Sequence, residues 1–275
     1  MIRQSNCKLT VLVLLHNKTI EESKTISSML SFKKKLNDEI ELIIWNNGCS
    51  KGSEVYLDDD TYDVKTINSY DNVNISQVYN KVIYDYFSSQ RIVIFDDDSL
   101  VDISYISSLI SFGEEPVICP DILFNGEKVY PISIDSNTVI DSNVKRSIKS
   151  INSGLSLSRT LIDKIRDENG DVFDSRFSFY GVDFSFFYRL DRLSIDVLQV
   201  GSLEHSLSRF EVTYSKNDFR WRQKLYENIL MVRNYPEYNS KVLIIKVLCK
   251  VLISFSLNTI SSSVRVFLNN MSTIK

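Results

Sequence analysis

Short apolar runs alternate with amphipathic segments over the first hundred residues of the chain. The runs are rich in Val, Ile and Leu and are bounded by polar residues, which is typical of strands buried on both faces of a parallel sheet. Between them, apolar residues recur at a loose helical spacing. This pattern predicts strands over 9–15, 40–45, 64–67 and 92–95, and helices over 20–36 and 75–87. The order favours an α/β fold, a mostly parallel sheet flanked by helices.

The remainder of the chain is less regular. A polar segment rich in Ser and Asn, residues 135–150, is expected to be a surface loop. Short strands are expected over 116–120, 122–124, 151–158 and 195–200, and helices over 159–166, 180–193 and 217–235.

Charge divides the chain into an acidic body and a basic tail. Residues 209–275 contain 11 Lys or Arg and 4 Asp or Glu, a net charge of about +7, although the whole chain carries only −3. So small a net charge argues against nucleic acid as a partner. We expect one catalytic domain over residues 1–208 and a helical appendage over 209–275, with a membrane surface or another copy of the chain as candidate contacts of the tail.

Within the tail, residues 240–257 are strongly apolar but are punctuated by Lys241, Lys246 and Lys250. Two interpretations stay open: a helix lying in a membrane interface with its lysines at the headgroups, or a terminal helix packed on the protein's own core. The chain has no apolar run long enough to span a bilayer, no signal-peptide pattern at its start, and four widely spaced cysteines. These features predict a cytoplasmic protein with free thiols, with a peripheral position at the inner face of the membrane as the alternative.

Polar residues follow three of the predicted strands, at His16 and Asn17, at 46–48, and at 96–98. The carboxyl ends of parallel strands meet at one edge of a sheet, where ligands bind in such folds. Side chains alternate along a strand, so Asp96 and Asp98 should point the same way and Asp97 the other way. Paired carboxylates suit Mg²⁺ or Mn²⁺ together with a substrate's phosphates, although an acidic turn that caps the next helix would look alike.

Two later residues are candidates for chemistry. Asp183 follows Gly181 at a predicted helix start, where a carboxylate is either a cap or a general base that takes a proton from a hydroxyl. His205 is one of only two histidines, and a neutral imidazole binds divalent ions of the transition type, whereas a lone histidine is more often an ordinary surface or core residue. Trp45, Tyr180, Trp221 and Tyr226 either stack on sugar rings or pack in the core.

Taken together and in order, these motifs resemble those of family-two inverting glycosyltransferases of the GT-A (Rossmann-like) fold, in particular bacterial rhamnosyltransferase-like enzymes that build surface polysaccharides such as O-antigen or capsule. The resemblance runs from about Thr10 to about His205. It rests on the first strand with His16 and Asn17, the Asn46-Asn47-Gly48 turn, the Asn72 to Asn80 segment, Asp96-Asp97-Asp98, Asn152-Ser153-Gly154, Val182-Asp183 with Arg189, and His205.

The resemblance implies a nucleotide-diphosphate sugar donor, a glycan or lipid-linked glycan acceptor, and Mn²⁺ or Mg²⁺ as cofactor. By it, Asp98, Asp96 and His205 are metal contacts, with Asp96 also near the donor's ribose, and Asp183 is the base. Donor contacts would come from His16, Asn17, Asn46, Asn47, Asn74, Asn80, Asp96 and Asp97, and acceptor contacts from Ser153, Gly154, Tyr180 and Gly181.

Two departures from the family pattern keep other interpretations open. Asn46 replaces the aspartate that contacts the nucleobase, and Val182 replaces an acidic residue before Asp183. A non-catalytic nucleotide-sugar or glycan-binding module on a decayed transferase fold is therefore an alternative. A phosphatase-type aspartyl nucleophile at 96–98 is a further alternative, but that motif usually follows a domain's first strand.

Overall fold

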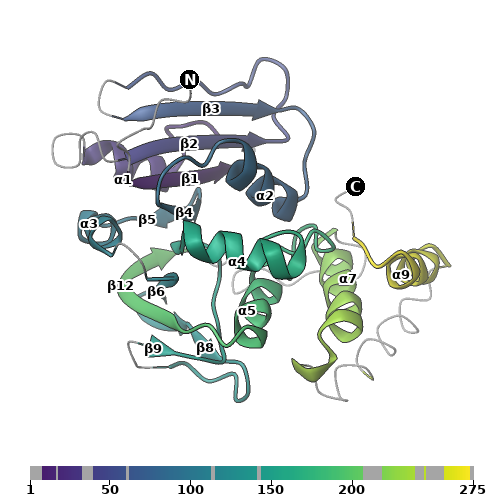
Figure 1. Ribbon diagram of the computed structural model, residues 1–275. Coiled ribbons are helices and arrows are strands. Elements are labelled where there is room, and N and C mark those ends of the chain that lie inside the picture. Colours follow the sequence, from purple (N-terminus) through teal and green to yellow (C-terminus); the bar gives the residue numbers. More distant parts are fainter. Residues whose placement is uncertain are drawn as a thin grey trace.

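A curled, mostly parallel sheet with helices on both faces forms the body of the protein (Figure 1). The computed structural model describes residues 8–16, 18–32, 40–59, 62–112, 115–140, 144–206, 219–238, 245 and 257–272. Among these residues, no helix combines the length and the apolar character needed to cross a membrane.

The N-terminal half follows the predicted order of elements. Its strands lie side by side as β3-β2-β1-β4, and each neighbouring pair is parallel. Every residue of β1 and β2 is buried, which explains why both strands read as continuous apolar runs. The elements are β1 (Leu9–Leu15), α1 (Lys24–Ser31), β2 (Ile40–Asn47), β3 (Asp63–Ser69), α2 (Ile75–Asp85) and β4 (Arg91–Asp96). Helix α1 is shorter than predicted because it begins after Ser23, whose hydroxyl accepts a hydrogen bond from the Ile26 amide at 3.2 Å.

The second half of the sheet mixes strand directions. Strand β11 (Leu155–Ser158) runs antiparallel to both β4 and β6 (Val117–Phe124), and β12 (Val197–His205) runs parallel to β6. The remaining strands are β5 (Ser99–Leu100), β7 (Glu127–Tyr130), β8 (Ile132–Ser133), β9 (Val144–Lys145) and β10 (Ile148–Lys149). The segment 135–150, predicted as a loop, therefore contains two short strands, which form because β9 pairs with β12 and β10 with β8 rather than from any local preference.

Strand β6 is continuous through Pro120 and Asp121, where the sequence predicted two short strands over 116–120 and 122–124. Proline cannot donate to a ladder, and the register of β12 shifts opposite it, with Gln199 aligned to Cys119 and Ser202 to Asp121. The two residues between Gln199 and Ser202 form this irregularity and let β12 continue past the predicted end at 200 as far as His205. The same irregularity thus decides where His205 lies.

The sheet separates two apolar clusters. One face packs against α1 and α3 (Ile103–Ser111) through residues such as Ile26 and Ile106. The other packs against α2, α4 (Arg159–Asn169), α5 (Val182–Arg192) and α7 (Phe219–Asn234). Leu225 and Leu230 of α7 belong to this second cluster, so this helix of the tail is anchored to the body.

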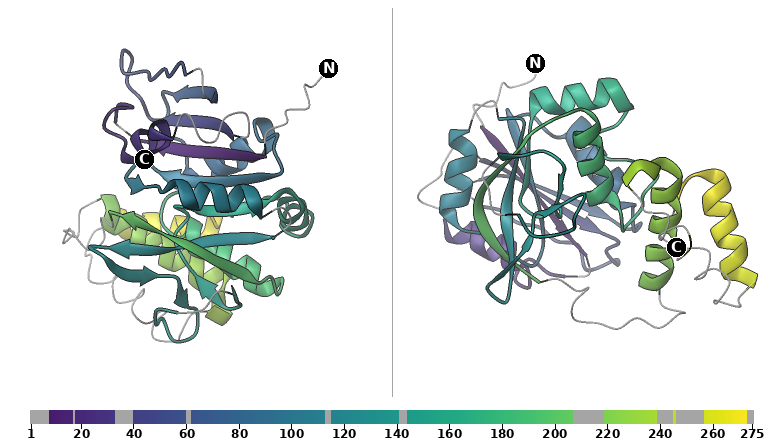
Figure 2. Two further views of the ribbon diagram at one scale, coloured as in Figure 1. Left: turned by 90° about the vertical axis from the view of Figure 1, so that its left-hand side faces the viewer. Right: turned by 90° about the horizontal axis from the view of Figure 1, so that it is seen from below.

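Helix α9 (Leu257–Asn269) lies outermost, beyond α7 and the short η1 turn (Pro236–Tyr238) (Figure 2). The residues after it bind back to the body, since the Ser272 amide donates to the Arg176 carbonyl at 2.9 Å and the Asn234 amide donates to Asn270 Oδ1 at 2.7 Å. The segment 240–257 lies almost wholly outside the described residues, so both interpretations of it stay open, as does the domain boundary at 208.

Candidate functional site

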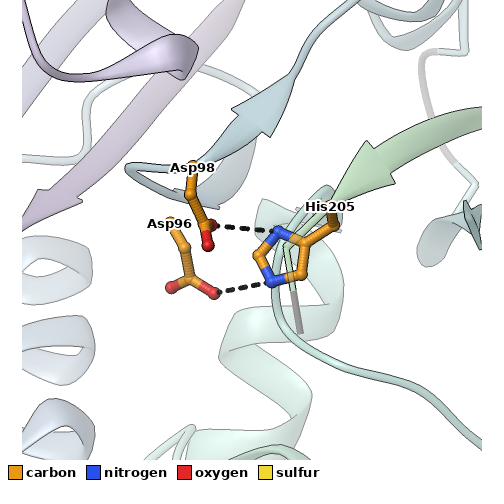
Figure 3. Close-up of side chains that lie close together, drawn as sticks. All are labelled: Asp96, Asp98 and His205. Atoms are coloured by element: carbon orange, nitrogen blue, oxygen red, sulfur yellow. Dashed lines mark ion pairs between the residues drawn. The ribbon is translucent and has the colours of Figure 1, made fainter. Parts of the chain in front are cut away.

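Three ligand-type side chains meet where β4 and β12 end (Figure 3). Asp96 is the last residue of β4, Asp98 follows in the turn, and His205 ends β12. His205 Nδ1 lies 3.2 Å from Asp98 Oδ1, and His205 Nε2 lies 3.8 Å from Asp96 Oδ2. Because β12 pairs with β5 so that His205 faces Ser99, residues 106 positions apart become neighbours. The predicted common direction of Asp96 and Asp98 is confirmed.

The donor set of this cluster fits a divalent ion. One ligand atom from each residue lies within 4.8 Å of the others. Asp98 Oδ1 is buried and accepts no hydrogen bond of good geometry among the described residues, a costly arrangement that a bound cation would relieve. Two carboxylates and one imidazole suit Mn²⁺, and the carboxylates alone suit Mg²⁺. We therefore name Asp96, Asp98 and His205 the metal triad.

Negative charge exceeds positive charge in the metal triad. Burial raises the pKa of Asp96 above its ordinary range; His205 lowers it, and the neighbouring aspartates add to the rise. Burial also raises the pKa of Asp98, against the opposing effect of His205. Burial and the repulsion from neighbouring aspartates thus disfavour several charged carboxylates here, and a bound cation would offset that repulsion.

Hydrogen bonds from two buried serine hydroxyl groups fix the positions of the metal triad. Ser99 Oγ lies 2.9 Å from His205 Nδ1 and 2.6 Å from Ser153 Oγ. Ser153 Oγ also accepts the Asp96 amide at 3.2 Å. Gly154 has a φ of +82°, and a Cβ there would lie 2.5 Å from Leu203 Cδ1, so only glycine fits. Ser153 and Gly154, predicted on the acceptor side, instead lie behind the metal triad and do not line the cavity described next.

A cavity of about 840 Å³ opens beside the metal triad. Asp183, in the first turn of α5, lines the same cavity, as do Tyr180 and Gly181. Burial, and then the charges of Asp96 and Asp183, raise the pKa of Tyr79 well above its ordinary value, so this phenol is within electrostatic reach of both acids. The structure therefore brings the predicted metal ligands and the predicted base to one space.

Asp97 pairs with a lysine rather than with His205, and its predicted direction opposite to Asp96 and Asp98 stays a prediction. Its Oδ1 forms an ion pair with Lys18 Nζ at 2.5 Å, and both residues line the cavity. His16 Nδ1 lies 2.9 Å from the Asn47 carbonyl oxygen, and the Asn47 side chain binds both the amide and the carbonyl of Val73. His16, Asn47 and Asp97 all line the cavity, and their role as donor contacts stays a prediction.

The structure places three other predicted donor contacts away from the lining. Asn46 donates to the Ser53 carbonyl and to Asn68 Oδ1, and Asn80 binds the amide and carbonyl of Phe173. Asn74 is the N-cap residue of α2 and is buried. The Asn46 and Asn80 amides therefore fix loops rather than face the cavity. Asn17 lies outside the described residues.

Sequence analysis did not identify most of the residues with which α7 lines the cavity. Trp221, expected to stack on sugar or pack, lines the cavity, whereas Trp45 is buried beneath the sheet face. Of the other two candidate aromatics, Tyr180 lines the cavity and Tyr226 packs against the second apolar cluster. Lys18, Asn72, Tyr79, Phe219, Arg220, Lys224 and Glu227 line the cavity but were not proposed as site residues. The cluster of basic and aromatic residues in 217–235 was the one feature of the sequence that pointed to these residues. The sequence did not show which part of the fold this helix packs against.

No protein-family model matches the sequence, and a sequence search of curated proteins finds no match. Solved structures do match in fold. S. aureus TarS aligns with a TM-score of 0.51 and 14% identity over 82% of this chain and 40% of that chain. S. aureus TarS 1-349 in complex with UDP-GlcNAc aligns with a TM-score of 0.51 and 14% identity over 96% and 72%. GalNAc-T7 with UDP, GalNAc and Mn²⁺ aligns with a TM-score of 0.56 and 10% identity over 82% and 48%.

The chain thus spans less than half of the longer TarS and GalNAc-T7 chains that it matches. These neighbours are GT-A glycosyltransferases, and their mixed sheet flanked by helices is the architecture described above. The protein has the GT-A fold, and the predicted fold class is confirmed. At 10 to 14% identity the likeness establishes the fold and leaves the activity to the site.

Proposed function

We propose that the protein is a metal-dependent inverting glycosyltransferase that moves a sugar from a nucleotide-diphosphate donor to a hydroxyl of a carbohydrate acceptor. The observation that carries this proposal is the shared cavity, which has the metal triad on one side and Asp183 on another. Two fold neighbours support it, because GalNAc-T7 has been solved with UDP and Mn²⁺ and TarS 1-349 in complex with UDP-GlcNAc.

Asp98, with Asp96 and His205, would hold the divalent ion. When bound, that ion neutralises charge on the diphosphate and so makes it a better leaving group. Lys18 adds a positive charge at the same wall, and the Ser99–Ser153 hydroxyls keep the His205 ring in place. We assign His16, Asn47 and Asp97, which line the cavity, to contacts with the donor.

Asp183 is the proposed base. The N-terminus of α5 carries partial positive charge, which favours the deprotonated carboxylate that must accept the proton of the attacking hydroxyl. A single displacement with this base inverts the anomeric carbon and leaves no sugar attached to the protein. Val182 is fully buried in the core, so an acidic residue is not needed there to complete the cavity wall.

A thermal-shift panel of UDP, dTDP, GDP and CDP, each with and without Mn²⁺ or Mg²⁺, tests the donor site. We expect one nucleotide to raise the melting temperature in a metal-dependent way, and Asp98→Ala to abolish the shift. Asp183→Asn should keep the shift and lose turnover, because a base acts mainly on the chemical step. No shift with any nucleotide would contradict the proposal, and donor binding without hydrolysis or transfer would favour a non-catalytic module.

The finer proposal concerns the biological acceptor and the sugar. We place the enzyme in surface polysaccharide synthesis, transferring a hexose or deoxyhexose to a lipid-linked glycan at the cytoplasmic face of a membrane. The basic tail supports this placement, since each Lys or Arg near an anionic surface contributes about 1 kcal/mol. Deleting 240–257 should then shift the protein from membrane to soluble fractions, and unchanged partitioning would contradict the membrane contact.

A further inference from the structure

Helix α7 presents a polar stripe to the cavity. Arg220, Lys224 and Glu227 are spaced at i, i+4 and i+7, which places them on one face of the helix, and all three line the cavity with Phe219 and Trp221. Other positions of the helix, among them Leu225 and Leu230, pack in the core. A helix docked only for stability needs the apolar face alone, so the polar and aromatic stripe calls for a separate explanation.

Glu227 is the unusual member of this stripe. Only 4% of the residue is exposed, and a carboxylate so deeply buried is costly unless it is fully paired. Its Oε2 atom is itself buried and forms an ion pair with Lys224 Nζ, one turn earlier on the same helix, although Lys224 is half exposed and the contact lacks hydrogen-bond geometry. The buried Lys149 is a second positive charge close enough to interact with Glu227. Because Glu227 lines the cavity, it is the acidic residue of this stripe that a ligand there would meet.

Glu227 also lies against the start of the helix that bears Asp183. Gly181 has a φ of +89°, and a Cβ at this position would lie 2.8 Å from Glu227 Cγ and 2.6 Å from Phe177 Cδ1. No larger residue fits between the Glu227 side chain and the first turn of α5. Asp183 and Glu227, which are 44 positions apart in sequence, are consequently brought to the same part of the cavity by the packing of α7 on α5.

We propose that Glu227 and Lys224 form the acceptor subsite, where the carboxylate and the ammonium bind hydroxyl groups of the acceptor sugar and Trp221 packs on its ring. Carboxylate acceptors, an ammonium donor and an aromatic face together match the hydroxyls and the apolar face of a pyranose. This subsite presents the attacking hydroxyl to Asp183. The inference rests on the proposed function and deepens it by naming the residues that select the acceptor.

The test compares Glu227→Gln with Glu41→Gln. Glu41 is also a buried carboxylate, 2% exposed and paired with the partly exposed Lys65, but it lies at the start of β2 and does not line the cavity. Binding of methyl and octyl glycosides of glucose, galactose, rhamnose and N-acetylglucosamine is followed by tryptophan fluorescence with the metal and nucleotide bound. Trp221 lines the cavity whereas Trp45 is buried, so the quenching reports the proposed subsite.

We expect Glu227→Gln to weaken binding of the preferred glycoside by about 10-fold or more, because a charged hydrogen-bonding partner is lost. The metal-dependent nucleotide shift should stay unchanged, and Glu41→Gln should alter neither measurement. Lys224→Met should also weaken glycoside binding. Because it changes a half-exposed side chain, it tests the subsite even if the Glu227 variant does not fold.

The inference alone fails if wild type shows the nucleotide shift but binds none of the glycosides, or if Glu227→Gln and Lys224→Met bind them as wild type does. It also fails if Glu41→Gln weakens glycoside binding equally, since the effect would then be one of general stability. Loss of the nucleotide shift in wild type is a different outcome, and it would overturn the proposed function itself.

Discussion

The metal triad and a second cluster of charged residues, around Asp174, are built in opposite ways. In the metal triad, two carboxylates share one imidazole, and burial raises the pKa of both acids. In the second cluster, Asp174 accepts hydrogen bonds from Arg176 at 2.6 and 2.7 Å and from the Tyr235 hydroxyl at 2.7 Å, with Arg189 3.6 Å away. We call these four residues the Asp174 cluster.

The balance of charge explains the difference between the two clusters. Burial by itself would raise the pKa of Asp174, but the hydrogen bonds and charges of Arg176 and Arg189 hold it below its ordinary value. Arg189 also donates to the carbonyls of Asp171 and Val172, so the Asp174 cluster joins α5 to the loop before it. A fully paired acid stabilises a fold, whereas an acid with too few partners is ready for a ligand.

The largest effect is expected for Asp98→Ala, which should lower turnover without lowering the free energy of unfolding. Losing the metal contact should lower turnover on the order of 1000-fold, since a bound ion contributes several kcal/mol to the transition state. The free energy of unfolding measured without metal should stay the same or rise, because an under-paired buried charge is removed. Steady-state kinetics and urea unfolding measure the two quantities. A large loss of stability would make Asp98 a structural residue like Asp174.

Asp174→Asn should act on stability instead, with a loss of about 3 kcal/mol in the free energy of unfolding, because the buried Arg189 and the partly exposed Arg176 lose their charged partner. Nucleotide binding by the remaining folded protein should be unchanged. Asp171→Asn is the matched control, since its carboxylate is more exposed and contacts Arg189 and Ser175 but not Arg176, and it should cost less. Equal losses of stability in the two variants would contradict the interpretation that Asp174 is the main charged partner of the arginines.

Mn²⁺ should stabilise the protein by about 2.7 kcal/mol when its free concentration is 100 times its dissociation constant. Asp98→Asn and His205→Ala should each lose this increment, and Asp174→Asn should keep it, because only the metal triad binds the ion. Urea unfolding with and without Mn²⁺ measures the increment. If His205→Ala retained it in full, the ion would be held without the histidine.

The smallest effect concerns pH. The folded pKa of Asp174 lies below the value of about 4 expected for the unfolded chain, so its contribution is present above pH 4 and is lost as the pH falls through the folded value. The stability difference between wild type and Asp174→Asn should therefore stay constant from pH 7 to about 5 and shrink below about 4. A difference that shrank between pH 7 and 5 would contradict the lowered pKa.

Much of the fold was predictable because its signals are local. The apolar runs at 9–15 and 40–45 predicted β1 and β2, and the alternation in 92–98 predicted that Asp96 and Asp98 face the same way. Strand periodicity is set by each residue's immediate neighbours, so a short window of sequence contains it. The continuous β6 and the strands within 135–150 were not predictable, because pairing with distant strands formed them.

The asparagines illustrate the limit of motif reasoning. Asn46 and Asn80 were predicted to contact the donor, yet their amides bind loop and backbone groups on the sides away from the cavity lining. An amide that ends a strand has the same appearance in sequence whether it faces a ligand or caps a loop, because its partners come from segments up to 95 positions away.

The sequence by itself determined the parallel core, the carboxylates at the end of β4 and the position of Asp183 at a helix start, since each depends on local periodicity or capping. Only the tertiary structure decided which residues join them. The irregularity opposite Pro120 extends β12 and brings His205 to the aspartates, and the packing of α7 on α5 brings Glu227 against Gly181, in the cavity that Asp183 also lines. Such contacts depend on how whole elements pack to bury apolar surface, and no short stretch of the sequence records that.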